Sequence, residues 1–106
     1  MNITKDELLN CAKAAVADRG LNYGKPEDNF ARIARLWSAH IRNRYDETFV
    51  LDAADVAQMN ALMKIARLEN DFTHLDSWVD LAGYAACGAN ICCATDHGND
   101  HLPEKI

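Results

Sequence analysis

The sequence predicts an all-α protein, folded as a four-helix, mostly antiparallel bundle. Four segments repeat apolar residues at helical spacing, polar turn segments separate them, and the longest strand signal is the short stretch 48–51. With 106 residues, of which 49% are hydrophobic and 25% charged, the chain has the composition of one globular domain. We expect this helical domain to span residues 1–95 and to be followed by a flexible polar tail at 96–106.

Start and stop signals bound the expected helices. Thr4 followed by Glu7 is a capping-box pattern, and Gly20 is expected to end the first helix after Arg19. Pro26 suits the first turn of the second helix. The expected helices span residues 5–19, 26–42 and 53–69, and a fourth begins near residue 76.

The third expected helix carries apolar residues around most of its circumference, so we expect it at the centre of the bundle. The fourth is rich in glycine and alanine, which would allow close helix approach. Together these two features predict a homodimer or a higher homo-oligomer.

Helical spacing also predicts a polar seam between these two helices. Its members are Asn60, Lys64 and Arg67 on the third helix and Asp76, Asp80 and Tyr84 on the fourth. In an antiparallel hairpin the facing pairs are Arg67 with Asp76, Lys64 with Asp80 and Asn60 with Tyr84. The seam is either a structural ladder of ion pairs or the floor of a site for a metal and a phosphate.

The second interpretation predicts a magnesium site. Asp76 and Asp80 lie one helical turn apart, and Glu27 could add a third oxygen donor. Magnesium prefers oxygen ligands and commonly bridges carboxylates to substrate phosphates. Lys64 and Arg67 would then neutralise phosphate oxygens.

Two residues near the second helix are further candidates. Tyr23, beside Gly24, could stack on a base or pack against the helix that follows. Asn29 could contact a ligand or serve only as a helix-start residue. The Asp96–His101 pattern DHxxDH reads as a solvated chain end rather than a metal site. The sequence shows no nucleophile-and-base arrangement and no Gly-rich phosphate loop.

The net charge and the cysteines limit which binding partners and which cell compartment we expect. The net charge of -5 and pI near 5.2 argue against a long nucleic acid as partner. An acidic N-terminus and the lack of a long apolar window predict a protein that is neither exported nor membrane-bound. Four cysteines without paired CxxC spacing are expected to be reduced thiols, which predicts a cytoplasmic location.

Three segments carry a resemblance to known proteins. RGLNYGKPEDNFARIARLW, LMKIARLE and DSWVDLAGYAA are similar to a group of small bacteriophage-encoded proteins of uncharacterised function. That group in turn resembles MazG-like all-α nucleotide pyrophosphohydrolases. The resemblance implies a MazG-like helical bundle assembled into dimers or tetramers, in which magnesium held by ExxE and ExxD motifs activates a water that cleaves a nucleoside triphosphate to monophosphate and pyrophosphate.

Carried over by position, the resemblance makes Asp80 the closing aspartate of the second motif. Asp76 stands one residue too early for ExxD, and Glu27 with Asp28 is the only candidate for the first motif, since no ExxE is present. Glu27 and Asp80 are thereby the expected catalytic residues.

Three functions remain open from the sequence. The first is a magnesium-dependent nucleoside triphosphate pyrophosphohydrolase. The second is a non-catalytic nucleotide-binding protein, such as a phage sponge that sequesters a host immune signalling nucleotide. The third is a structural helical module whose seam is only a salt-bridge ladder.

Overall fold

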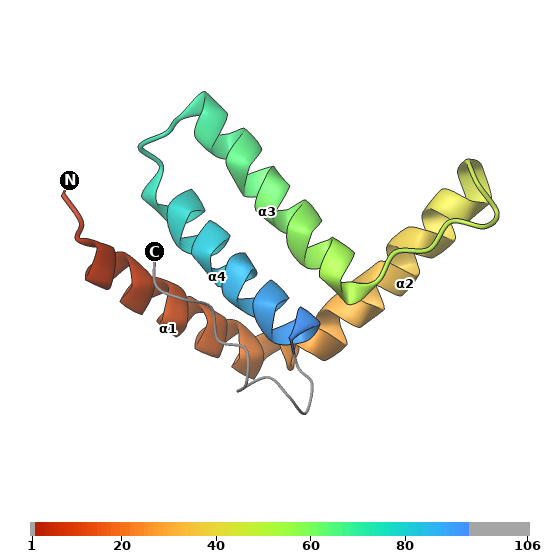
Figure 1. Cartoon of the computed structure of the whole chain (residues 1–106), viewed down its shortest axis with the longest axis horizontal. Helices are drawn as coiled ribbons and strands as arrows, with labels where there is room; N and C mark the ends of the chain where they lie inside the picture. The colour runs from red at the N-terminus through yellow and green to blue at the C-terminus, as the bar shows by residue number, and fades with distance from the viewer. Residues whose placement is uncertain (1, 94–106) are drawn as a thin grey trace.

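The computed structural model describes residues 2–93, which form four α-helices and no β-strand (Figure 1). The helices are α1 (Lys5–Tyr23), α2 (Pro26–Arg44), α3 (Ala53–Asn70) and α4 (Leu75–Cys92). The prediction of an all-α fold is therefore confirmed. The expected tail at 96–106, with its DHxxDH pattern, lies outside the described residues.

The end of α1 differs from the prediction. Thr4 forms the expected capping box with Glu7, but the helix continues through Gly20 and ends at Tyr23. Gly24 follows with φ of 83° and ψ of -177°, a conformation that is essentially restricted to glycine. The chain turns at Gly24 rather than at Gly20, so Arg19 and Tyr23 both lie on the helix.

Local capping also fixes the starts of α2 and α3. Pro26 occupies the first turn of α2, as predicted. Asp52 caps α3 by accepting a hydrogen bond from the backbone N–H of Asp55, whose side chain in turn accepts from the backbone N–H of Asp52. The connector between these helices is held by Ser38, whose hydroxyl oxygen accepts from the backbone N–H of Leu51 at 2.9 Å.

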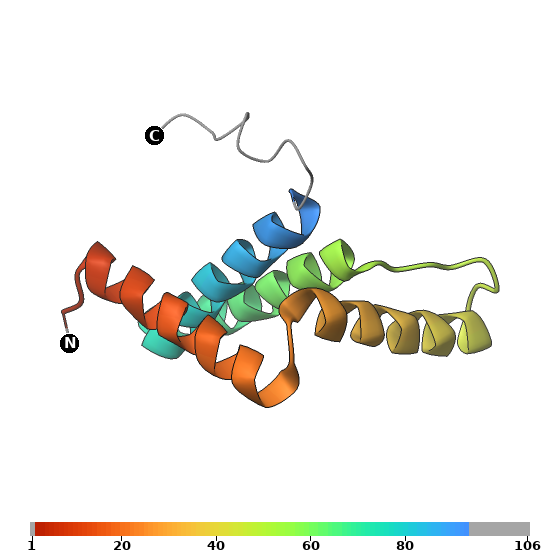
Figure 2. The same ribbon diagram turned by 90° about the horizontal axis from the view of Figure 1, so that it is seen from below.

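The helices are arranged around α4. It packs against α3 on one side, antiparallel to it, and against α1 on the other (Figure 1). Figure 2 shows α1 crossing α4 and the far end of α2 projecting from the other helices together with the connector at 45–52. The prediction that the helix at 53–69 is central is wrong for the described residues, because α3 lies at the edge of this arrangement.

Two glycines in α4 permit the close helix approach that the sequence predicts. A Cβ at Gly88 would lie 3.2 Å from the Cβ of Ala57 on α3, which is tighter than ordinary contact. A Cβ at Gly83 would lie 3.4 Å from Cγ2 of Val16 on α1. A side chain at Gly88 would thus hold α4 and α3 further apart, whereas a Cβ at Gly83 would only just contact Val16.

The core is small, and residues 2–93 leave one helix face exposed. The buried cluster consists of Phe30, Ala34, Val56, Ala57 and Cys87. On α3, five exposed residues form what we name the apolar α3 face, namely Met59, Leu62, Met63, Ile65 and Ala66. This face points away from α4, because the buried residues of α3 lie on the opposite side of the helix. No helix in the described part of the chain is long and apolar enough to cross a membrane.

Candidate functional site

An ion triad around the buried carboxylate of Asp80 joins α1, α3 and α4. Lys64 Nζ lies 2.7 Å from Oδ2 of Asp80, and both side chains are only 6% exposed. Arg19 Nη2 donates to Oδ1 of the same carboxylate at 3.1 Å, from a side chain that is 44% exposed. The predicted pairing of Lys64 with Asp80 is confirmed, and both oxygens of the carboxylate are occupied by cationic donors.

The triad keeps Asp80 ionised. Burial alone would raise the pKa of this carboxyl, but the hydrogen bond from Lys64 and the charges of Arg19 and Lys64 outweigh burial and hold the pKa below its ordinary value of 3.8. Two cations around one carboxylate leave the triad with a formal charge of +1. Since Lys64 is buried, the exposed part of this excess charge belongs to Arg19.

The triad borders a cavity of about 370 Å³ between α1, α2 and α4, with one residue of α3 in its wall. This volume lies within the range of small-molecule sites. Most of the wall surface is apolar, and the apolar residues that line it include Ala15, Val16, Pro26, Phe30, Ile33, Val79 and Cys87. Burial raises the pKa of the Cys87 thiol, so this wall group is neutral rather than a reactive thiolate.

Aromatic side chains shape one end of the cavity. Tyr84 packs against Phe30 with ring centroids 6.2 Å apart and planes tilted by 42°. Arg19 Nη1 donates to the Tyr84 hydroxyl at 3.1 Å, and its guanidinium carbon lies 5.6 Å from the ring centroid. Tyr23, at the last position of α1, completes the aromatic lining and is itself exposed. A planar ligand could therefore stack here beside a fixed positive charge.

Two amide side chains supply unused hydrogen-bonding groups. Asn29 on α2 and Asn60 on α3 both line the cavity. Neither amide takes part in the side-chain hydrogen bonds found within residues 2–93. Each amide can donate and accept, so the pair could fix the orientation of a polar ligand.

The structure gathers most of the residues that the sequence singles out. The cavity lining includes Tyr23, Asn29, Asn60, Asp80 and Tyr84. Asn60 and Tyr84, expected to face one another, share this wall, although the Tyr84 hydroxyl bonds to Arg19.

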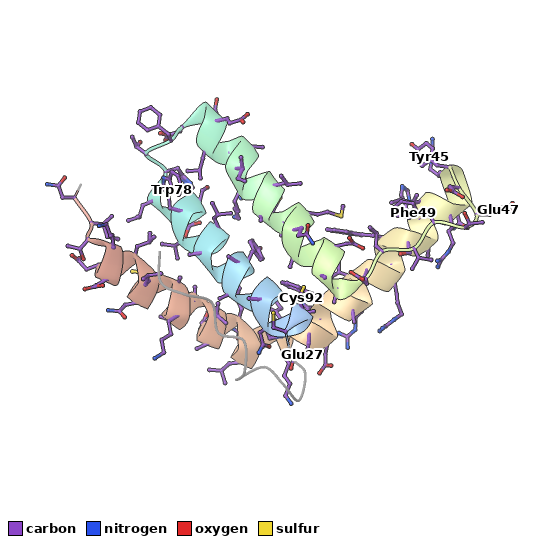
Figure 3. The ribbon with its side chains drawn as sticks, in the orientation of Figure 1. Glu27, Tyr45, Glu47, Phe49, Trp78 and Cys92 are labelled. Carbon is purple, nitrogen blue, oxygen red and sulfur yellow. The ribbon has the colours of Figure 1, made fainter. Side chains whose placement is uncertain are left out.

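The other candidates lie outside the cavity wall. Lys64 contacts Asp80 but is not among the lining residues. Arg67 and Asp76 are exposed, and no salt bridge between described residues joins them. Figure 3 shows Trp78, near the start of α4, at the opposite end of that helix from Glu27. Asp76, two residues before Trp78, is thus remote from Glu27.

These positions do not fit a magnesium ion held by Glu27, Asp76 and Asp80. Within residues 2–93 there is no group of three or more His, Cys, Asp or Glu side chains that could hold a metal. Both oxygens of Asp80 are already engaged by cations, since one accepts from Arg19 and the other pairs with Lys64. Magnesium requires oxygen ligands at about 2.1 Å. A magnesium ion that close to Asp80 would be repelled by the two cations that already contact this carboxylate. The magnesium site therefore remains a prediction, for which residues 2–93 provide no matching group of ligands.

Arg19 is the site residue that the sequence analysis missed. The expected helix at 5–19 already included Arg19, but no face or partner was assigned to it. Arg19 falls on the stripe of Ala12, Ala15 and Val16 at spacings of three and four, and the continuation of α1 places Tyr23 on the same stripe. A cation that interrupts an apolar stripe was therefore the signal available in the sequence.

The fold and the site define a small all-α protein in which a buried ion triad borders a cavity sized for a small molecule. The chain belongs to the DUF6378 family, described as a domain of unknown function, whose model matches residues 7–92. No solved structure matches the chain.

The curated relatives that match are bacteriophage proteins. The chain is 41% identical over 74 residues to the Gene 55 protein of Mycobacterium phage D29, and 38% identical over 82 residues to the Gene 55 protein of Mycobacterium phage L5. These matches cover 70% and 77% of this chain but only 45% and 46% of the relatives, so the chain spans about half their length. The predicted resemblance to bacteriophage proteins is confirmed, whereas the MazG-like resemblance stays a prediction.

Proposed function

We propose that the protein binds a nucleotide or a nucleotide-derived small molecule in the cavity between α1, α2 and α4, and holds it without cleaving it. The observation that carries this proposal is the combination, in one cavity of about 370 Å³, of aromatic rings, two amides and the half-exposed guanidinium of Arg19. Aromatic rings suit a base, amides suit its polar edge, and a guanidinium suits a phosphate.

Retention rather than cleavage is favoured by the state of Asp80. A carboxylate that activates water needs an oxygen available to the water or to a metal that binds it. Both oxygens of Asp80 are engaged by cations, and its lowered pKa makes it a weak base. Glu27 is exposed and does not line the cavity, so it is not available as a second carboxylate.

The nucleoside triphosphate pyrophosphohydrolase is the second candidate function. One observation favours it: Asp80, the residue that the MazG-like resemblance would make catalytic, lies in the wall of the cavity. In that case ligand binding would have to displace Lys64 or Arg19 from the carboxylate and free an oxygen for metal or water.

The test is a thermal-shift screen of nucleotides, followed by chromatography of any stabilising nucleotide after incubation with the protein. A ligand at about 100 times its dissociation constant stabilises the native state by about 2.7 kcal/mol, which moves the midpoint by several degrees. We expect a hit that is recovered intact. Conversion to monophosphate and pyrophosphate would favour the hydrolase, and a screen without any hit would favour a structural module.

Arg19→Gln locates the hit in the cavity. Loss of a hydrogen bond to a charged ligand group costs about 1.5–3 kcal/mol, so the affinity should fall about 10- to 150-fold. The matched control is Arg35→Gln, because Arg35 is an exposed arginine on α2 that does not line the cavity. Equal affinities of the two variants would place the ligand elsewhere on the protein.

We also propose that two copies of the chain associate through the apolar α3 face. Leu62, at its centre, is 62% exposed, and Met59 and Met63 flank it on the same side of the helix. Apolar side chains that recur on one face of a helix are expected to be covered by another surface. Sedimentation velocity of the full chain measures this association.

A further inference from the structure

Lys64 does not line the cavity, yet its ammonium is buried. Its side chain is 6% exposed, and its ammonium lies 2.7 Å from Oδ2 of Asp80, whereas Arg19 contacts Oδ1. Burying an ammonium is costly, so its position requires an explanation in terms of the carboxylate that it pairs with.

We propose that the Lys64 ammonium occupies the position that a divalent cation would take at Asp80, so that the cavity binds a phosphate-bearing ligand through Arg19 without any metal. This inference rests on the proposed function. Lys64 neutralises the carboxylate, which would otherwise repel a phosphate, and it does so from behind the cavity wall. Arg19 remains half exposed, and its donors that are not used by Asp80 and Tyr84 can reach the ligand.

The charge of the triad indicates the class of ligand. A formal charge of +1 suits a single phosphate group better than a triphosphate, whose charge is normally shared with magnesium. The nearby exposed cation Lys25 is followed within three residues by Glu27 and Asp28, which offset it. We therefore expect the site to prefer a nucleoside monophosphate, or a ligand with one exposed phosphate, over a metal-chelated triphosphate.

The experiment is calorimetry of the full wild-type chain with adenosine and guanosine monophosphates and the matching triphosphates, each in excess EDTA and in excess MgCl₂. We expect monophosphate affinity to agree within about twofold between the two buffers and to exceed triphosphate affinity, and Arg19→Gln to lower it at least about tenfold. Binding that appears only with magnesium, or that weakens at least about tenfold in EDTA, would overturn the inference while supporting the proposed function.

A second measurement does not depend on the nucleotide. Free Mn²⁺ is followed by electron paramagnetic resonance during titration of the wild-type chain and of Asp76→Asn, a substitution at an exposed position. Saturable binding that this substitution weakens would overturn the inference, because Asp76 would then hold a metal with Asp80. No saturable binding, or binding that the substitution leaves unchanged, is the expected result. Failure of every nucleotide to bind in either buffer would overturn the proposed function and the phosphate-binding part of the inference together.

Discussion

Replacing Lys64 with methionine should destabilise the protein at neutral pH by more than a typical point substitution. The change removes the ammonium 2.7 Å from Asp80 and leaves a carboxylate that is only 6% exposed. Removing one partner of a buried ion pair costs about 3–5 kcal/mol. Arg19 stays at 3.1 Å and compensates part of the charge, so we expect about 3 kcal/mol, the lower end of that range.

Urea unfolding at fixed protein concentration measures this free energy, and thermal unfolding gives a second reading. For a domain of this size a loss of about 3 kcal/mol lowers the midpoint by about 12–24 °C. Lys13→Met is the matched control: Lys13 is an exposed lysine on α1, so the same substitution should change the free energy of unfolding by less than about 0.5 kcal/mol. The double variant Lys64→Met with Asp80→Leu should recover most of the loss, because it removes the buried charge as well.

The pH dependence provides a further check on the cause. In the wild type the pKa of Asp80 is depressed, so its contribution to stability is present above the ordinary value of 3.8 and is lost as the pH falls through the lower pKa of the folded state. Without Lys64, burial should raise the pKa of Asp80, which then takes up a proton at a higher pH. The deficit of Lys64→Met should thus shrink as the pH is lowered from 7 toward 4. A deficit below about 1 kcal/mol at pH 7, or one that grows in acid, would refute this account.

Two further predictions concern the turn after α1 and the exposed face of α3. Gly20 is helical with no atom near a built Cβ, so Gly20→Ala should raise the free energy of unfolding by about 0.5–1 kcal/mol, whereas Gly24→Ala should lower it by about 1–3 kcal/mol because of the φ of 83°. Urea unfolding of the two variants measures both effects. Equal changes in the free energy of unfolding would show that the positive φ at position 24 does not require glycine. Leu62→Glu should convert a self-associating chain to monomer in sedimentation velocity, while Leu9→Glu, at an exposed leucine of α1, should not. A wild-type chain that is monomeric at all concentrations would contradict the proposed association.

Helical spacing predicted the centre of the site because its chemistry is local to two helices. Lys64 and Asp80 each follow a regular spacing along one helix, and a short turn between α3 and α4 leaves little freedom in how they meet. The pairing of Arg67 with Asp76 did not form. Both residues are exposed near the turn, where water competes with any ion pair.

What the sequence could not provide was the relation between helices that are far apart in the chain. Arg19 meets Asp80 across 61 positions, a contact that depends on how α1 packs against α4. Either of two neighbouring glycines could have ended that helix, and only the backbone conformation at Gly24 decides between them. The number of apolar residues on α3 was similarly ambiguous. It does not show whether other helices of the same chain cover every face of α3 or leave one face exposed.

The ion triad also constrains how this protein can change over evolutionary time. With apolar residues in place of Lys64 and Asp80 the protein would be at least as stable, because no buried charge would then need a partner. The same exchange would leave Arg19 without the carboxylate that positions it at the cavity. Selection for stability alone would thus favour apolar side chains at these positions, and selection for the proposed ligand binding would oppose it. A buried ion pair in so small a protein domain is the pattern that such a trade-off would produce.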